Sequence, residues 1–329
     1  MQRLPFANEG SEGSEGSEGS EGSEGSEGSE GSEGSEGSRV SGIATYSGYR
    51  TSALLANALL TTQGELLRGY WQNGTWNPDT TTTALTLDQK MRRWSRKVRS
   101  QLYDFQLTAG LGFDSSAAPD GILTKPGGTL LRLSPPTYET GNTQNFKNKL
   151  QEVIDKSALR PDRLSEILTQ VTIPYSYFAM LLNLQPGRHR FTYELMAAAM
   201  NLSGIAVMQF KHFFGVRRPA DHSALVQPLL LTPGHGAYPM GHATQSYFLA
   251  HVLLNLFGTG AGSDLDTQMQ ALAYRISENR VIAGLHFMED LTAGQALGNE
   301  LGRYFVGVAG NANTPLNWLW GLAAAEKAV

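Results

Sequence analysis

Apolar residues recur at helical spacing over most of the chain. The most regular stretch covers residues 192–215, where the apolar positions fall at i, i+4, i+7 and i+11: Leu195, Ala199, Leu202 and Ala206. This spacing places them on one face of an amphipathic helix. The pattern therefore predicts a helix that opens near residue 192 and ends near residue 215.

The same spacing predicts further helices on both sides of this one. They cover 52–71, 85–107, 144–156, 162–184 with a kink at Pro174, 242–257, 265–283, 287–308, and a last helix opened by Thr314-Pro315. Proline is favoured at the first position of a helix. Residues 109–142 look like a long irregular excursion, and 216–241 like a loop. Because alternating strand patterns are scarce, we expect an all-α fold rather than a parallel sheet.

The first 38 residues differ from the rest. Residues 11–37 are nine tandem copies of Ser-Glu-Gly, with no apolar side chain to bury and like charge at every third position. Residues 1–38 are therefore expected to be a disordered leader. An acidic interaction tail is one interpretation, and a linker, artefact or placeholder is the simpler one. We assign residues 39–329 to a single helical domain.

Composition excludes several classes of protein. The chain has a formal net charge of −4, but residues 39–329 hold 25 basic and 20 acidic side chains, a net +5. This is too little to indicate a nucleic-acid partner. No run of 18 apolar residues predicts a membrane span, and the start lacks the apolar run of a signal peptide. The absence of cysteine excludes disulfides and thiolate sites. The sequence does not indicate the cellular compartment or the oligomeric state, and a homo-oligomer is one open alternative.

Three polar clusters carry candidate chemistry, and the first is KHFFGVRRP, from Lys211 to Pro219. Pro219 favours an extended conformation for Arg218, so the helix is expected to end before it. Taken alone, Lys211 and Arg218 are better explained as solvated cations near a helix end.

The second cluster is AYPMGHAT, in which Met240 and Gly241 precede His242 at the start of a helix. A helix N-terminus offers free N–H groups to an anion. A histidine at this place can exchange a proton near neutral pH. A surface histidine near a helix start is the alternative.

The third cluster is NRVIAGLHFMED, which contains Arg280, His286 and Asp290. Arg280 lies on the apolar stripe of its helix, where a buried charge needs a partner or an anion. His286 and Asp290 are four residues apart and can hydrogen-bond on one helix face. Such a carboxylate fixes the imidazole tautomer and suits a metal ligand or a nucleophile. A buried, satisfied His–Asp pair is the alternative.

Together the clusters supply three cationic donors, a backbone amide and two histidines, which a tetrahedral oxyanion requires. Their order and spacing resemble the motifs K-x6-RP, P-S-G-H and S-R-x5-H-x3-D of the vanadium-dependent haloperoxidases and the type-2 phosphatidic acid phosphatases. The resemblance is firmest over about residues 160–305 and implies the helical bundle of that superfamily. It also implies vanadate as the cofactor, held by Lys211, Arg218, Arg280 and the Gly241 amide, with phosphate able to occupy the same place.

The resemblance implies a chemical role for each of the two motif histidines. His286 would bind vanadium, oriented by Asp290, and His242 would deprotonate hydrogen peroxide. The metal would stay oxidised and act as a Lewis acid. Lys211 would polarise the peroxide for attack by halide, giving hypohalous acid, with an organic molecule as a further acceptor.

Halide preference is implied by one loop residue. His235 stands five residues before the second motif's Met240, where bromoperoxidases of the family carry histidine and chloroperoxidases phenylalanine. This favours bromide or iodide. An unrelated loop histidine, one of seven in the chain, is the alternative.

Three positions depart from the motifs. Met240 replaces the serine whose hydroxyl would hydrogen-bond the oxyanion, a loss of about 1.5–3 kcal/mol, or roughly 10- to 150-fold in affinity. Asn279 replaces the other motif serine but can still hydrogen-bond, and Met288 stands where proline is frequent. A methionine beside such a site is open to oxidation. We therefore expect weakened vanadate binding, or a weakened, self-inactivating peroxidase.

Two other functions stay open. In an acid phosphatase, His286 would attack phosphorus, His242 would protonate the leaving group, and vanadate would inhibit. In a non-catalytic relic, which Met240 motivates, the site would bind an oxyanion without turning it over.

Overall fold

The computed structural model describes residues 57–58, 60–66, 84–139, 143–172, 175–258 and 262–327. The chain divides into two compact units, Met1–Leu85 with Ser95–Lys97, and Thr86–Trp94 with Val98–Val329. In the first unit, residues 57–58 and 60–66 are helical. The leader of residues 1–38 and Pro174 lie outside the described residues.

The second unit is mostly helical, which confirms the predicted all-α class. Its elements are α3 (Leu87–Arg93), α4 (Arg96–Thr108), α5 (Thr143–Lys156), α6 (Arg160–Thr169), α7 (Tyr175–Leu182), α8 (Arg190–Phe214), α9 (Pro219–His222), α10 (Gly241–Phe257), α11 (Asp264–Ile282), α12 (Met288–Ala309) and α13 (Pro315–Glu326), with the short 3-10 turns η3 (Thr137–Glu139) and η4 (Ser157–Leu159).

The predicted irregular excursion contains a small sheet, so that prediction was wrong in part. Strands β1 (Gly112–Asp114), β2 (Gly121–Lys125) and β3 (Gly128–Leu133) pair antiparallel in the order β1-β2-β3. The β2–β3 turn uses Gly127 and Gly128, both at positive φ, which glycine adopts without steric cost. Short strands with glycines at their ends leave little alternation for a sequence pattern to detect.

Two predicted helices are each split. The segment 85–107 forms α3 and α4, because the backbone is extended at Trp94. The segment 162–184 forms α6 and α7. The helices predicted over 144–156, 242–257, 265–283 and 287–308 are confirmed to within two residues as α5, α10, α11 and α12.

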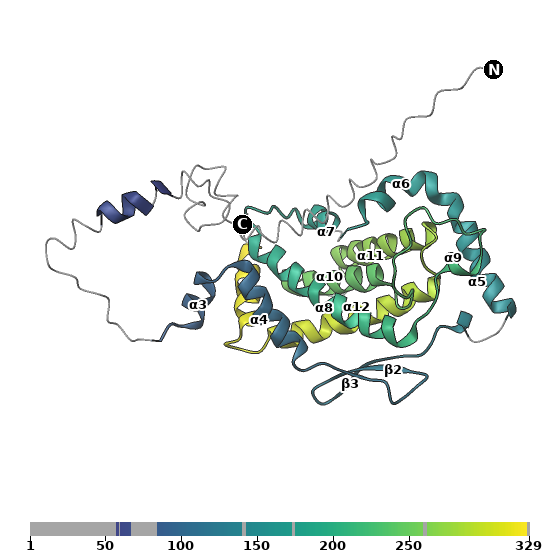
Figure 1. Cartoon of the computed structure of the whole chain (residues 1–329), viewed down its shortest axis with the longest axis horizontal. Coiled ribbons are helices and arrows are strands. Elements are labelled where there is room, and N and C mark those ends of the chain that lie inside the picture. Colours follow the sequence, from purple (N-terminus) through teal and green to yellow (C-terminus); the bar gives the residue numbers. More distant parts are fainter. Residues whose placement is uncertain are drawn as a thin grey trace, which may run out of the picture. The chain divides into compact units, whose positions relative to one another are not determined.

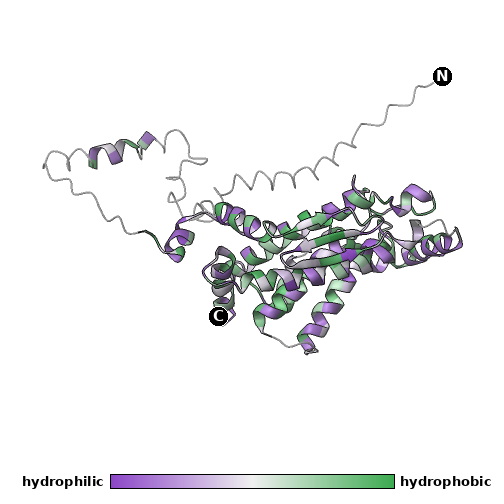
Figure 2. Ribbon diagram, turned by 90° about the horizontal axis from the view of Figure 1, so that it is seen from below, coloured by the Kyte–Doolittle hydropathy of each residue, from purple (hydrophilic) through white to green (hydrophobic). Residues whose placement is uncertain are grey.

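Helix α10 lies at the centre of the second unit and packs against α8, α11 and α12 (Figure 1). Its interior side chains are largely fully buried; Phe248, for example, meets Phe305 of α12 edge to face at 5.6 Å. Hydrophobic and hydrophilic residues both occur along the helical ribbons of the chain (Figure 2). Helix α10 is buried around most of its circumference, as expected of a helix at the centre of a core.

Helix α8 ends where predicted, at Gly215, which adopts a left-handed conformation with φ 60° and closes the helix. The run Arg190–His222 is long and apolar enough to cross a membrane by length and composition alone. Of its most apolar window, 61% is buried inside the protein. This burial is typical of the core helix of a folded domain.

Candidate active site

The first turns of α10 and α12 are held together by direct backbone contact. The Met240 N–H, just before α10, donates to the Asp290 carbonyl in the first turn of α12 at 2.9 Å. A Cβ at Gly294 would stand 2.5 Å from the Met240 carbonyl oxygen, and one at Gly298 would stand 2.5 Å from the Thr244 carbonyl oxygen. Only glycine allows this approach, which brings the second and third motifs together.

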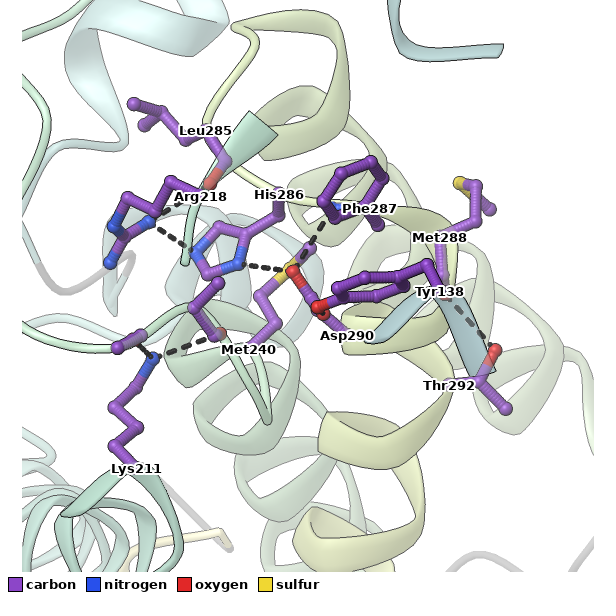
Figure 3. A network of polar contacts seen from close by, with 12 residues as sticks. Tyr138, Lys211, Arg218, Met240, Leu285, His286, Phe287, Met288, Asp290 and Thr292 are labelled. Carbon is purple, nitrogen blue, oxygen red and sulfur yellow. Dashed lines mark hydrogen bonds and ion pairs between the residues drawn. The ribbon is translucent and has the colours of Figure 1, made fainter. Parts of the chain in front are cut away.

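His286 and Asp290 form the predicted pair at the start of α12 (Figure 3). The His286 Nδ1 lies 3.0 Å from Asp290 Oδ2, which also accepts from the Phe287 N–H at 3.0 Å. The Tyr138 hydroxyl donates to Asp290 Oδ1 at 2.6 Å. Burial raises the pKa of Asp290 to about 6, so the carboxylate is ionised at neutral pH. Nδ1 must then carry the proton, and the lone pair of His286 lies on Nε2.

Arg218 donates a hydrogen bond to that lone pair. Its Nη1 donates to His286 Nε2 at 3.2 Å and to the Leu285 carbonyl at 2.9 Å. Its backbone N–H donates to Asp221 Oδ2 at 2.8 Å, which anchors the start of the one-turn α9. The Arg218 side chain is 2% exposed. The extended backbone predicted before Pro219 is confirmed, with ψ 161° at Arg218.

His235 borders the site from the loop before α10. Its Nδ1 lies 3.3 Å from Arg218 Nη2, and its carbonyl oxygen accepts from Arg218 Nε at 3.3 Å. The ring is otherwise exposed, although partial burial lowers its pKa. The structure thus places His235 at the solvent side of Arg218.

Lys211 reaches the same place from the last turn of α8. Its Nζ donates to the carbonyl oxygens of Gly236 at 2.6 Å and Ala237 at 3.0 Å. Burial, with Arg218 nearby as a second cause, lowers the pKa of Lys211 to about 7. Its third N–H is left for a ligand, because an ammonium has three donors.

Arg280 approaches from α11 and is 1% exposed. Its Nη2 donates to the Ile167 carbonyl at 2.8 Å, and its Nε has no hydrogen-bond partner among the described residues. Burial lowers the pKa of Arg280 to about 10. An unpaired N–H on a buried cation costs free energy unless an acceptor meets it.

His242 is the second residue of α10. Its Nε2 lies 2.7 Å from the Gln170 carbonyl oxygen, which can only accept, so Nε2 carries the proton and Nδ1 is an acceptor. Burial, and then the positive charge of Arg280, lowers the pKa of His242 to about 4. His242 is therefore a neutral imidazole with a free base nitrogen at neutral pH.

The chemistry of this set suits an oxyanion. Lys211, Arg218 and Arg280 are buried, and among the described residues none of them forms an ion pair with a carboxylate. Nothing lies within 4 Å of where a Cβ of Gly241 would stand, so the N-terminus of α10 faces open space. No group of three or more His, Asp or Glu side chains suited to a metal ion occurs in the described part of the chain.

Two of the three motif departures, Met240 and Asn279, are buried but have different surroundings. Met240 is fully buried at the N-cap position of α10 and makes no side-chain cap hydrogen bond; it lies in the same network as His286 and Asp290 (Figure 3). Asn279 is also fully buried, but its amide hydrogen-bonds Arg163 and Glu166 of α6 and Gln170 just after that helix. Only the Met240 substitution removes a hydrogen-bond donor from the motifs.

The sequence motifs did not reveal two residues of this site. Tyr138 binds Asp290 across 152 positions of sequence, and its ring lies 4.1 Å from that of Phe287. Glu289 fixes this segment by accepting from the Thr137 N–H at 2.8 Å. Gln170 binds His242 across 72 positions. Neither Tyr138 nor Gln170 belongs to a short motif, so spacing alone gave no signal.

Comparison with known proteins gives remote structural likenesses. No protein-family model and no curated protein matches the chain. One similar solved structure is a transmembrane PAP2 type phosphatidylglycerolphosphate phosphatase from Bacillus subtilis, with 15% identity, a TM-score of 0.39, and coverage of 52% of this chain and 89% of that one. Another is a bacterial vanadium-dependent iodoperoxidase, with 21% identity, a TM-score of 0.42, and coverage of 53% and 52%. At such low scores the site's own residues and distances, rather than these likenesses, carry its interpretation.

Proposed function

We propose that this protein is a vanadate-dependent haloperoxidase. The observation that supports it best is the set of three buried cations without carboxylate partners, gathered beside a histidine whose lone pair lies on Nε2. A multiply charged oxyanion would neutralise these cations, and Arg280 Nε would gain an acceptor.

Each residue has a defined task in this proposal. Lys211, Arg218, Arg280 and the Gly241 N–H would hold the oxyanion oxygens, and His286 Nε2 would bind the metal. Vanadate, when bound, supplies a Lewis acid that activates hydrogen peroxide towards halide. Asp290 would keep the proton on His286 Nδ1 and the lone pair on Nε2; Nε2 accepts from Arg218 in this structure, so Arg218 would turn from it to the anion on binding.

His242 would accept the proton of hydrogen peroxide at Nδ1. This assignment is supported by the hydrogen bond from Nε2 to the Gln170 carbonyl, which leaves Nδ1 as the acceptor. A pKa of about 4 keeps the imidazole in the basic form at neutral pH.

His235 is proposed to favour bromide or iodide over chloride. It contacts Arg218 and is exposed, so a halide that approaches from solvent would meet its ring close to the reacting oxygens. An organic halide acceptor would use the same side of the site.

An acid phosphatase is the second candidate, and Met240 is the observation that favours it. A side chain without a donor weakens the hold on an oxyanion by roughly 10- to 150-fold, which suits a transient phosphoester better than a resident cofactor. His286 Nε2 would then attack phosphorus, and protonated His242 would donate a proton to the leaving group. With a pKa of about 4 for His242, such activity would be confined to acidic pH.

One set of assays separates the candidates. The full chain is assayed with hydrogen peroxide plus bromide, and with a phosphate ester at acidic and neutral pH, each with and without orthovanadate. Bromide oxidation that depends on vanadate supports the haloperoxidase, phosphate release suppressed by vanadate supports the phosphatase, and neither activity contradicts both. His286→Ala is expected to abolish the activity, whereas His212→Ala, an exposed histidine at the end of α8, retains it.

A further inference from the structure

Gln170 is a buried residue outside the motifs that touches the site twice. It follows the end of α6 and is 1% exposed. Its carbonyl oxygen accepts from His242 Nε2 at 2.7 Å, and its side-chain Oε1 accepts from Asn279 Nδ2 at 2.9 Å. Gln170 thus lies between the motif histidine and the residue that precedes Arg280.

The orientation of the Gln170 amide follows from its charged neighbours. Arg163 Nη1 lies 3.1 Å from Asn279 Oδ1, and Glu166 Oε2 lies 3.0 Å from Asn279 Nδ2. A guanidinium only donates and an ionised carboxylate only accepts. The Asn279 oxygen must therefore face Arg163 and its nitrogen must face Glu166 and Gln170.

The orientation of the Asn279 amide determines the orientation of the Gln170 side-chain amide. Because Asn279 presents N–H groups to Gln170, the oxygen of Gln170 faces Asn279 and its Nε2 points elsewhere. That Nε2 is buried and has no hydrogen-bond partner among the described residues. A serine at position 279 could not bridge Arg163, Glu166 and Gln170 in this way, since a hydroxyl has one donor.

Two unpartnered N–H groups therefore occur on the α6 side of the site. The Nε of Arg280 is the other one, and the Nη2 of the same guanidinium is anchored at 2.8 Å on the Ile167 carbonyl, one turn before Gln170 on α6. Both groups are buried donors, and neither has a hydrogen-bond acceptor among the described residues. A shared oxyanion would satisfy both.

We propose that the Gln170 side-chain amide is a further binding residue for the oxyanion, replacing the donor that Met240 removes. The proposal rests on the proposed oxyanion site, but not on which reaction the site performs. Asn279 acts as the positioning residue that turns the Gln170 N–H groups towards the anion. Glu166, itself held by Arg275 at 2.6 and 2.8 Å, keeps Asn279 in place.

Two substitutions at this position separate binding from folding. Gln170→Glu keeps an oxygen for Asn279 and nearly the same shape, but places a carboxylate where the anion would bind. Gln170→Met keeps the approximate volume and removes the donor. We expect Gln170→Met to weaken orthovanadate and inorganic phosphate binding by about 10- to 150-fold, the cost of one hydrogen bond to a charged group, and Gln170→Glu to weaken it more.

The readout is isothermal titration of the full-length protein with orthovanadate and with phosphate, with thermal unfolding of each variant as the folding check. The resonance of the Gln170 side-chain amide, followed in the wild type, should shift when phosphate is added. If the wild type binds neither anion, the oxyanion site itself is wrong. If the wild type binds and Gln170→Met binds equally well, or the amide resonance does not move, the assignment of Gln170 is wrong while the oxyanion site stands.

Discussion

Met240 is the motif position whose side chain differs most in its chemistry from the serine of the motif. Its backbone keeps the structural task of the motif, because the Met240 N–H joins α10 to Asp290 at 2.9 Å. Its side chain has no donor to offer and is fully buried. The backbone of this position therefore still joins the two helices, while its side chain would offer no hydrogen bond to the proposed anion.

Restoring the hydroxyl should recover that contact. We expect Met240→Ser to raise orthovanadate affinity by about 10- to 150-fold, the value of a hydrogen bond to a charged group, measured by calorimetric titration. Serine also leaves a cavity in the core, so Met240→Ala serves as the control that makes the same cavity without a hydroxyl. Equal affinities for the serine and alanine variants would show that position 240 does not face the anion.

At the scale of elements, the site depends on the contact between α10 and α12. Gly294 and Gly298 lie on the α12 face that meets α10, and both would place a Cβ 2.5 Å from a backbone oxygen. No side-chain rotation relieves a clash with backbone, so the two helices would have to move apart. That movement would displace His242 from the His286–Asp290 pair.

Gly294→Ala should therefore lower both stability and anion affinity. We expect a loss of about 1–3 kcal/mol in the free energy of unfolding, as in other overpacked contacts, with weaker orthovanadate binding. Gly307→Ala lies in the same helix with nothing within 4 Å of its Cβ, and should gain up to about 1 kcal/mol from helix propensity. Urea unfolding measures both. A Gly294→Ala protein as stable as Gly307→Ala would contradict the close packing.

At the scale of the whole molecule, the sequence predicted the helices and the motif residues better than the connections between them. Long amphipathic helices such as α8 and α12 can be predicted from the periodicity of their apolar residues. Lys211 and Arg218 were identified as candidate site residues from the spacing of their motif. The sheet of 112–133 was missed because its strands are short and bounded by glycine. Tyr138 and Gln170 were missed because only tertiary packing brings them to Asp290 and His242.

The buried, neutral histidines should also make the stability of the protein depend on pH. The pKa of His242 falls to about 4, and that of His286 lies well below its usual value, against about 6.5 in an unfolded chain. The unfolded chain thus binds protons at these histidines that the native protein does not, so their contribution to stability is full above about pH 6.5 and falls towards pH 4. Asp290, with its pKa raised to about 6, acts in the opposite direction, but only below pH 6.

We expect the wild type to lose more stability between pH 7 and pH 5 than His242→Gln does, by about 2 kcal/mol. Glutamine can still donate to the Gln170 carbonyl but does not titrate. Urea unfolding of both proteins at the two pH values, without added oxyanion, gives the comparison. Equal losses would mean that His242 is not held neutral in the native protein.

The strongest evidence at the scale of the whole molecule is a set of three buried basic side chains, Lys211, Arg218 and Arg280, none of which forms an ion pair with a carboxylate among the described residues. Calorimetric titration of the full-length protein with orthovanadate tests the proposed oxyanion site most directly. We predict saturable binding of one vanadate per chain that phosphate competes away and that His286→Ala weakens, while His212→Ala leaves it unchanged. Absence of saturable binding of both orthovanadate and phosphate would contradict the oxyanion site.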